Sequence, residues 1–159
     1  MFDFYEDLVV GSKITFGSYT FTADAIKAFA REFDPQPFHI DEAAAQRSHF
    51  GALIASGWHT ATMWMRMMVD CREREHAARR ARGEPVPELG PSPGIRELRW
   101  LKPVRVGDTL TYGTEVFDKR ISTSRPGWGL MMLRNFAVDQ NGEPALTWVS
   151  SAFVERRPP

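Results

Sequence analysis

The sequence has a single cysteine, Cys71, so it can form neither an intrachain disulfide nor a cluster of thiolate metal ligands. Such sparing use of cysteine fits a reducing compartment, and we expect a cytoplasmic location. The first residues, MFDFYEDLVV, carry acidic side chains where a secretory signal needs a basic start and a long apolar run. The sequence therefore predicts an intracellular protein without covalent cross-links.

A long hydrophobic run and an excess of one charge are also missing. The most apolar segment, residues 51–69, is interrupted by Ser56, His59, Thr60, Thr62 and Arg66, so we expect no membrane span. Lysine plus arginine and aspartate plus glutamate each total 20, which gives a formal net charge of zero. That balance argues against a general nucleic-acid binder.

The chain length and composition suit one globular domain. The 159 residues are 43% hydrophobic and contain no internal repeat or low-complexity tract. This is enough apolar material for one substantial core. We therefore expect a single domain over residues 1–159.

The first third of the chain predicts one strand followed by short helices. Residues 13–21 are rich in β-branched and aromatic side chains and predict a strand. Thr22 is a candidate N-cap for a helix over residues 23–33, which the prolines at 35 and 37 prevent from continuing. Asp41 then predicts the start of a short helix that ends at Arg47.

A longer helix is expected from Ser56 or Gly57 onward. Its first half, up to Asp70, has apolar residues all round, which is typical of a helix enclosed by the rest of a fold. Residues 71–82 alternate arginine and glutamate and predict an extension of the helix into solvent. The proline- and glycine-rich residues 83–94 predict a surface loop.

The last third predicts several long antiparallel strands. A strand over residues 95–104 is followed by three segments, 108–117, 130–138 and 145–154, in which apolar residues alternate. In the second of these segments the alternation groups Leu130, Met132, Phe136 and Val138 on one side, interrupted by Arg134. The order of elements predicts an α+β fold in which a curved antiparallel sheet wraps around the central helix.

The segment FDPQPFHIDEAAA, residues 33–45, holds the first candidate functional residues. Asp34 and His39 are separated by two prolines, which restrict the backbone between them. Taken alone, the segment fits a turn with a capping aspartate and a packed histidine better than it fits a catalytic pair. The spacing of His39, Asp41, His49 and His59 matches no recognised metal site, so none is expected.

Three segments in order resemble one known family. FDPQPFHID, FGALIASGWHT and RELRWLKPVRVGDTL are similar to the MaoC-like dehydratases and R-specific enoyl-CoA hydratases, which have the hotdog fold. The family signature is an aspartate, any residue, an asparagine, a proline, any residue and a histidine, which here falls on Asp34 to His39. The resemblance extends from about the first strand to the last.

The resemblance implies a hydratase or dehydratase that acts on an enoyl- or 3-hydroxyacyl-thioester. Asp34 and His39 would activate water, which adds in a syn sense, and the backbone amide of Gly57 would stabilise the charge on the thioester oxygen. Gln36 would orient Asp34 or brace the loop, and Ser56 is a further candidate beside the substrate. The substrate would be carried by coenzyme A or an acyl-carrier protein, with no separate cofactor, and the chain would form a homodimer or a larger homo-oligomer.

Three positions depart from the family pattern. Gln36 replaces asparagine, Phe33 replaces a common glycine, and Met65 stands where R-specific hydratases have a serine. These departures motivate one alternative, a non-catalytic acyl-binding hotdog subunit. A hotdog acyl-CoA thioesterase is a second alternative, although the Asp34–His39 loop fits that class poorly. Arg99, Lys102 and Arg105 are candidates for coenzyme A phosphates, although ordinary surface charge explains them equally well.

Overall fold

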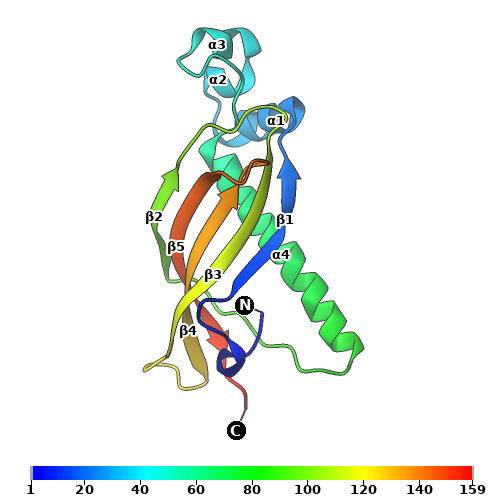
Figure 1. The fold of residues 1–159 in the computed structure, drawn as a ribbon, viewed down its shortest axis with the longest axis vertical. Helices are drawn as coiled ribbons and strands as arrows, with labels where there is room; N and C mark the ends of the chain where they lie inside the picture. The colour runs from blue at the N-terminus through cyan, green and yellow to red at the C-terminus, as the bar shows by residue number, and fades with distance from the viewer. Residues whose placement is uncertain (1, 159) are drawn as a thin grey trace.

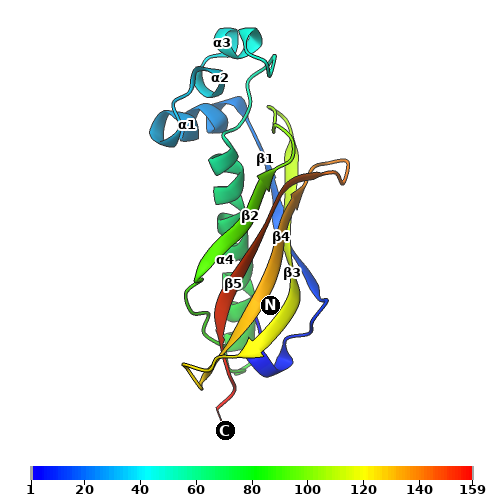
Figure 2. The ribbon, with the colours of Figure 1, turned by 90° about the vertical axis from the view of Figure 1, so that its left-hand side faces the viewer.

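The computed structural model describes residues 2–158, which form a curved five-stranded antiparallel sheet with one long helix along one face (Figures 1 and 2). The strands lie in the order β1-β3-β4-β5-β2. Three short helices gather at one end of the sheet, above the start of the long helix α4 (Figure 2). The elements are a 3-10 turn at Tyr5–Asp7, β1 (Lys13–Thr20), α1 (Ala23–Phe33), α2 (Pro37–Ile40), α3 (Glu42–Arg47), α4 (Gly57–Ala81), β2 (Gly94–Trp100), β3 (Thr109–Ile121), β4 (Trp128–Val138) and β5 (Pro144–Glu155).

The short helices begin and end where their sequence signals predict. Thr22 caps α1, because its side chain accepts a hydrogen bond from the Ala25 N–H at 3.2 Å. Asp41 caps α3 in the same way, through the Ala44 N–H at 2.6 Å. Between them the structure adds α2, a four-residue helix with Pro37 in its first turn, where the sequence predicted only a loop.

The helix α4 begins at Gly57 as predicted and continues for 25 residues into the charged segment. One side packs on the sheet through Trp64, Met68 and Cys71, which belong to the hydrophobic core. The expected enclosure on all sides is wrong for the single chain, because Trp58 is 55% and Met65 52% exposed. The sheet covers only one side of α4, so the apolar residues of its other side remain open.

The strands β3, β4 and β5 carry the helix-facing core. In their register Tyr112 lies opposite Ala137, and Ala137 lies opposite Leu146, and all three side chains are buried. On β4 the helix-facing residues are therefore the odd-numbered ones, including the buried Asn135. The apolar side that the alternation of Leu130, Met132, Phe136 and Val138 indicated is mainly the opposite side of the sheet.

Asn135 explains why the pattern misled. Its amide accepts a hydrogen bond from the Thr114 hydroxyl at 2.8 Å and donates one to the Ser150 hydroxyl at 2.8 Å. Polar residues on three neighbouring strands thereby satisfy one another inside the core. An amide that reads as a solvent-facing residue in the sequence is buried because its partners come from distant strands.

A buried histidine, His59, joins α4 to α1 and β1. Its ring stacks on Phe29 with centroids 4.5 Å apart and meets the edge of Phe21 at 5.0 Å. The side chain is 4% exposed, and within residues 2–158 its Nδ1 has no hydrogen-bond partner. Burial without a partner lowers the pKa of His59 to about 4, so the ring is neutral in the folded protein at neutral pH.

We expect the free energy of unfolding to fall as the pH drops from about 7.5 to about 5.5. Over this range the unfolded chain protonates His59 at its ordinary pKa, whereas the folded chain does not, so acid favours unfolding. His76, which is also buried with a lowered pKa, acts in the same direction. Urea denaturation should show that, over this pH range, the free energy of unfolding falls by roughly 1 kcal/mol less in a His59→Phe variant than in wild type. Equal falls in the two proteins would contradict this account.

Candidate active site

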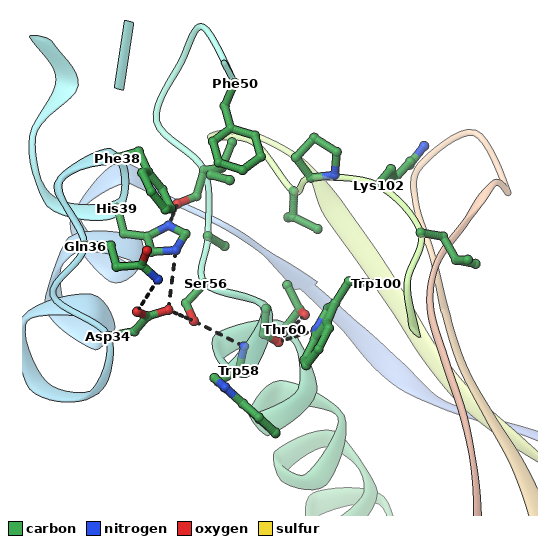
Figure 3. A pocket seen from close by; sticks show the side chains of 16 residues that line it. Asp34, Gln36, Phe38, His39, Phe50, Ser56, Trp58, Thr60, Trp100 and Lys102 are labelled. Atoms are coloured by element: carbon green, nitrogen blue, oxygen red, sulfur yellow. Dashed lines mark hydrogen bonds and ion pairs between the residues drawn. The ribbon is translucent and has the colours of Figure 1, made fainter. Parts of the chain in front are cut away.

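The chain places Asp34 and His39 together by ending one helix and starting another. Asp34 is the C-cap of α1, and Pro35 and Pro37 hold the chain extended up to the first turn of α2. His39 lies in α2 and is 4% exposed. Its Nε2 lies 3.4 Å from the Oδ2 of Asp34, so the two side chains meet across the turn (Figure 3).

A backbone carbonyl sets the tautomer of His39. The Nδ1 atom lies 2.8 Å from the carbonyl oxygen of Ile54, in a buried contact. A carbonyl oxygen only accepts hydrogen bonds, so Nδ1 carries the hydrogen. In the neutral ring Nε2 then has a free lone pair, which is directed towards the side of Asp34. His39 can therefore accept a proton at Nε2.

Two side chains hold the carboxylate of Asp34. The Ser56 hydroxyl donates to Oδ2 at 2.6 Å, and the Gln36 amide donates to Oδ1 at 2.9 Å (Figure 3). Partial burial on its own raises the pKa of Asp34, but these two hydrogen bonds and the nearby His39 outweigh it and lower the pKa below its ordinary value. Asp34 is therefore ionised at neutral pH.

The start of α4 forms a second wall of the same site. Ser56 is its N-cap, with the hydroxyl accepting a hydrogen bond from the Trp58 N–H at 3.2 Å. Gly57 follows as the first helical residue, where backbone N–H groups lack partners within the helix and the helix dipole is positive. A negatively charged oxygen placed against this wall would be stabilised.

Gly57 is needed because a tryptophan lies directly on it. The indole Nε1 of Trp100 donates to the Gly57 carbonyl at 2.8 Å. A Cβ atom at position 57 would lie 2.6 Å from that nitrogen, which is closer than atoms can pack. The absent side chain therefore lets the end of β2 contact the start of α4.

These residues surround one cavity of about 440 Å³. It is lined by all five of the predicted site residues, together with aromatic side chains from the helices and the end of β2. The lining includes Asp34, Gln36, His39, Ser56, Gly57, Trp58 and Trp100. The arrangement sets a carboxylate and an imidazole against a helix N-terminus across a largely apolar space, which suits acid–base chemistry on a carbonyl compound.

The sequence did not single out two lining residues, Trp58 and Trp100. Each is a tryptophan within a segment that resembles the family, and each stays 43% or more exposed in the single chain. The position of Trp58 directly after Gly57 in the sequence could have indicated that its side chain lines the site. The Trp100–Gly57 contact joins residues 43 positions apart, however, and no local pattern indicates it.

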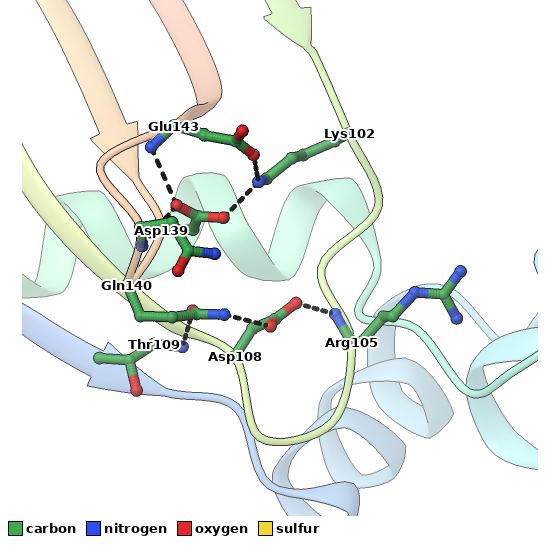
Figure 4. Close-up of polar contacts among 8 residues, drawn as sticks. Lys102, Arg105, Asp108, Thr109, Asp139, Gln140 and Glu143 are labelled. Carbon is green, nitrogen blue, oxygen red and sulfur yellow. Dashed lines mark hydrogen bonds and ion pairs between the residues drawn. The ribbon is translucent and has the colours of Figure 1, made fainter.

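The three basic candidates for phosphate binding have different surroundings. Lys102 lines the cavity, but its ammonium pairs with Asp139 and with Glu143, the latter at 2.8 Å (Figure 4). Its hydrogen bonds to these two carboxylates raise the pKa of Lys102. Arg105 donates to the Phe50 carbonyl at 3.0 Å, and Arg99 lines a separate surface hollow together with Glu97. Lys102 therefore connects the turn before β5 to the cavity wall, which leaves less of its charge for a ligand.

Comparison with known proteins identifies the family. Residues 7–127 match the MaoC-like domain. The chain belongs to the MaoC-like domain family.

Of the helices within residues 2–158, none has the length and apolar character needed to cross a bilayer.

Solved structures of MaoC-like proteins share the whole fold. A MaoC-like dehydratase from Rhodospirillum rubrum is 39% identical, with a TM-score of 0.81 over 98% of this chain and 99% of that one. An (R)-hydratase from A. caviae involved in PHA biosynthesis is 25% identical, with a TM-score of 0.64 over 96% and 99%. At the level of sequence, the protein YdeM from Bacillus subtilis is also similar, with 25% identity over 82% of this chain and 85% of its own length. The α+β hotdog fold expected from the sequence is confirmed, and more distant neighbours share it.

We expect a Ser56→Ala variant to raise the pKa of Asp34, because the hydroxyl that stabilises the carboxylate is removed. Carboxyl-carbon NMR titration would measure this shift. A Thr22→Ala variant is the matched control, since Thr22 also caps a helix, through the Ala25 N–H, but lies at the opposite end of α1 from Asp34. Each variant should lose about 1 kcal/mol of stability from the lost cap. A folded Ser56→Ala protein with an unchanged Asp34 pKa would contradict the assignment.

Proposed function

We propose that this MaoC-like protein hydrates an enoyl-thioester, or dehydrates the corresponding 3-hydroxyacyl-thioester. The observation that carries the proposal is the approach of His39 Nε2 to Asp34 Oδ2, at 3.4 Å, on a cavity wall shared with the start of α4. The family and its hydratase and dehydratase neighbours support the same class of reaction. The substrate is a thioester of coenzyme A or of an acyl-carrier protein, and no other cofactor takes part.

The two catalytic groups act on one water molecule. When the His39 ring is neutral, both its Nε2 and the Asp34 carboxylate accept hydrogen bonds, so a water between them can donate one hydrogen to each and direct a lone pair at the substrate. The water oxygen bonds to Cβ as its proton passes to the pair, and that proton is then delivered to Cα. The sum is addition of one water across the double bond, and dehydration is the reverse.

The start of α4 stabilises the negative charge that the reaction creates. When oxygen adds at Cβ, negative charge develops on the thioester carbonyl oxygen. The N–H of Gly57 and the positive end of the helix dipole stabilise an oxygen placed beside them. Ser56 and Gln36 act on the chemistry through Asp34, by holding its carboxylate in position. They are therefore positioning residues.

Gln36 weakens the case for a silent subunit. The departure from asparagine keeps an amide, and that amide donates to Asp34 at 2.9 Å. Met65 lies on α4 two turns beyond Gly57, outside the lining of the catalytic cavity. Neither departure removes a group that the proposed reaction uses.

We expect Asp34→Asn and His39→Ala each to lower kcat for hydration of crotonyl-CoA by about 10²- to 10⁴-fold, the usual contribution of acid–base groups. Loss of the enoyl-thioester absorbance follows the reaction, and a thiol reagent run in parallel detects thioesterase activity. Asp41→Asn is the control, because asparagine also caps a helix and Asp41 is outside the cavity lining. Folded Asp34 and His39 variants with wild-type turnover would rule out the pair, and thiol release without hydration would favour a thioesterase.

We further propose that two copies of the chain pair along β2. This strand is one of the two edges of the sheet, and its residues are mostly exposed, including Ile95 at 55%. An edge strand with exposed apolar side chains is a template for pairing. The open side of α4, with Trp58 and Met65, would gain cover from the same partner.

Light scattering coupled to size exclusion should therefore give a mass above that of the 18.1 kDa chain. A lysine in place of Ile95 should shift that mass towards the monomer, since it brings like charges together at a two-fold interface. Ile121→Lys is the control, because Ile121 is similarly exposed, at 48%, but lies on an inner strand. An Ile95→Lys protein of unchanged mass would exclude this edge as the interface.

A further inference from the structure

A second cavity adjoins the catalytic one along α4. It measures about 380 Å³ and lies between α4, β5 and the segment of residues 89–98. Its lining is mainly apolar, with Leu133 and Trp148 from the sheet. Among the residues that the structure describes, Trp58 alone lines both cavities. Its indole therefore stands at the boundary between the site of chemistry and this apolar chamber.

The chamber follows one stripe of the helix. The α4 residues along it recur at intervals of three and four: Trp58, Ala61, Met65, Met68 and Arg72. Such spacing keeps side chains on one face, and at 1.5 Å per residue the stripe is about 21 Å long. The chamber thus starts beside the catalytic residues and leads away from them. Its shape and lining suit a hydrocarbon chain.

A second tryptophan fixes the position of Trp58. The Trp58 and Trp100 rings pack edge to face, with centroids 5.3 Å apart at 78° (Figure 3). Trp100 is itself held by its hydrogen bond to the Gly57 carbonyl at 2.8 Å. An edge-to-face aromatic pair with one member anchored to backbone resists displacement. The boundary is therefore a braced indole, although it is more than half exposed.

We propose that Trp58 is a specificity-determining partition, which stops the acyl chain of a thioester in the catalytic cavity from entering the apolar chamber. The protein accordingly prefers short acyl chains, and removal of the indole joins the two spaces and admits longer ones. The proposal rests on the proposed thioester substrate. It concerns the length of the acyl group and is independent of the identity of the groups that carry out the reaction.

Calorimetric binding of saturated acyl-CoAs tests the partition, because these ligands need no turnover. The series is butanoyl-, hexanoyl-, octanoyl- and decanoyl-CoA. Wild-type affinity should stop rising after the short members, whereas that of Trp58→Ala should rise through the whole series. Decanoyl-CoA should bind the variant at least about tenfold more tightly than wild type, because each added methylene finds apolar surface to bury. The ratio of decanoyl- to butanoyl-CoA affinity, which cancels any general effect of the substitution on the catalytic cavity, should therefore be at least about tenfold higher in the variant.

Met65→Ala is the matched control. Met65 lies on the same stripe and is 52% exposed against 55% for Trp58, but it lines only the chamber. Its truncation should leave unchanged the chain length at which affinity stops rising. Trp58→Leu, which keeps apolar bulk, should give an intermediate result and serves if the alanine variant does not fold. A wild-type affinity that already rises through decanoyl-CoA, or an equal effect of Met65→Ala, overturns the proposal.

Hydration assays with the matching enoyl-CoAs separate this proposal from the proposed function. If Trp58→Ala shifts the binding series but wild type hydrates no member of the enoyl series, the partition stands and the hydratase proposal fails. If wild type hydrates enoyl-CoAs and Trp58→Ala leaves both the binding series and the kcat/KM profile unchanged, the hydratase stands and the partition fails.

Discussion

The hydroxyl of Ser56 makes the contact on which the site depends. It accepts from the Trp58 N–H at 3.2 Å and so starts α4, and it donates to Asp34 at 2.6 Å. One oxygen thereby fixes the carboxylate relative to the helix end that faces the same cavity. The helix α4 packs on the sheet through core residues, so the carboxylate is held against a well-packed element of the fold. The wall that would bind a developing oxyanion and the carboxylate that would act on water are therefore joined through a single hydroxyl.

The elements that the sequence predicted well are those with local signals. The N-caps Thr22, Asp41 and Ser56 each precede a helix at the expected residue, and the prolines after Asp34 end α1. The prediction of which side of β4 faces the helix was wrong, because the buried Asn135 forms hydrogen bonds with Thr114 and Ser150 on other strands. Alternation records which residues are apolar, and it carries no information about polar partners that only the sheet brings together.

For the candidate site, too, some features could be predicted from the sequence and others could not. The order of Asp34, His39 and Gly57 within segments that resemble a family was enough to predict that they share a cavity, and the structure places all of them on its lining. Their chemical roles remain predictions. The tautomer of His39 depends on the Ile54 carbonyl, and the availability of Lys102 depends on Asp139 and Glu143. These contacts span from 15 to 41 positions, so no short motif encodes them.

The hydrogen bond from Trp100 to Gly57 joins the central helix to an edge of the sheet. Gly57 belongs to the core helix, whereas Trp100 is the last residue of the edge strand β2. Any chain that adds a strand to this edge acts on a residue that lines the catalytic cavity. If a second chain pairs with this edge, binding there and binding in the cavity would be linked, and by reciprocity a ligand that favours one arrangement of the indole would change the strength of association at the edge.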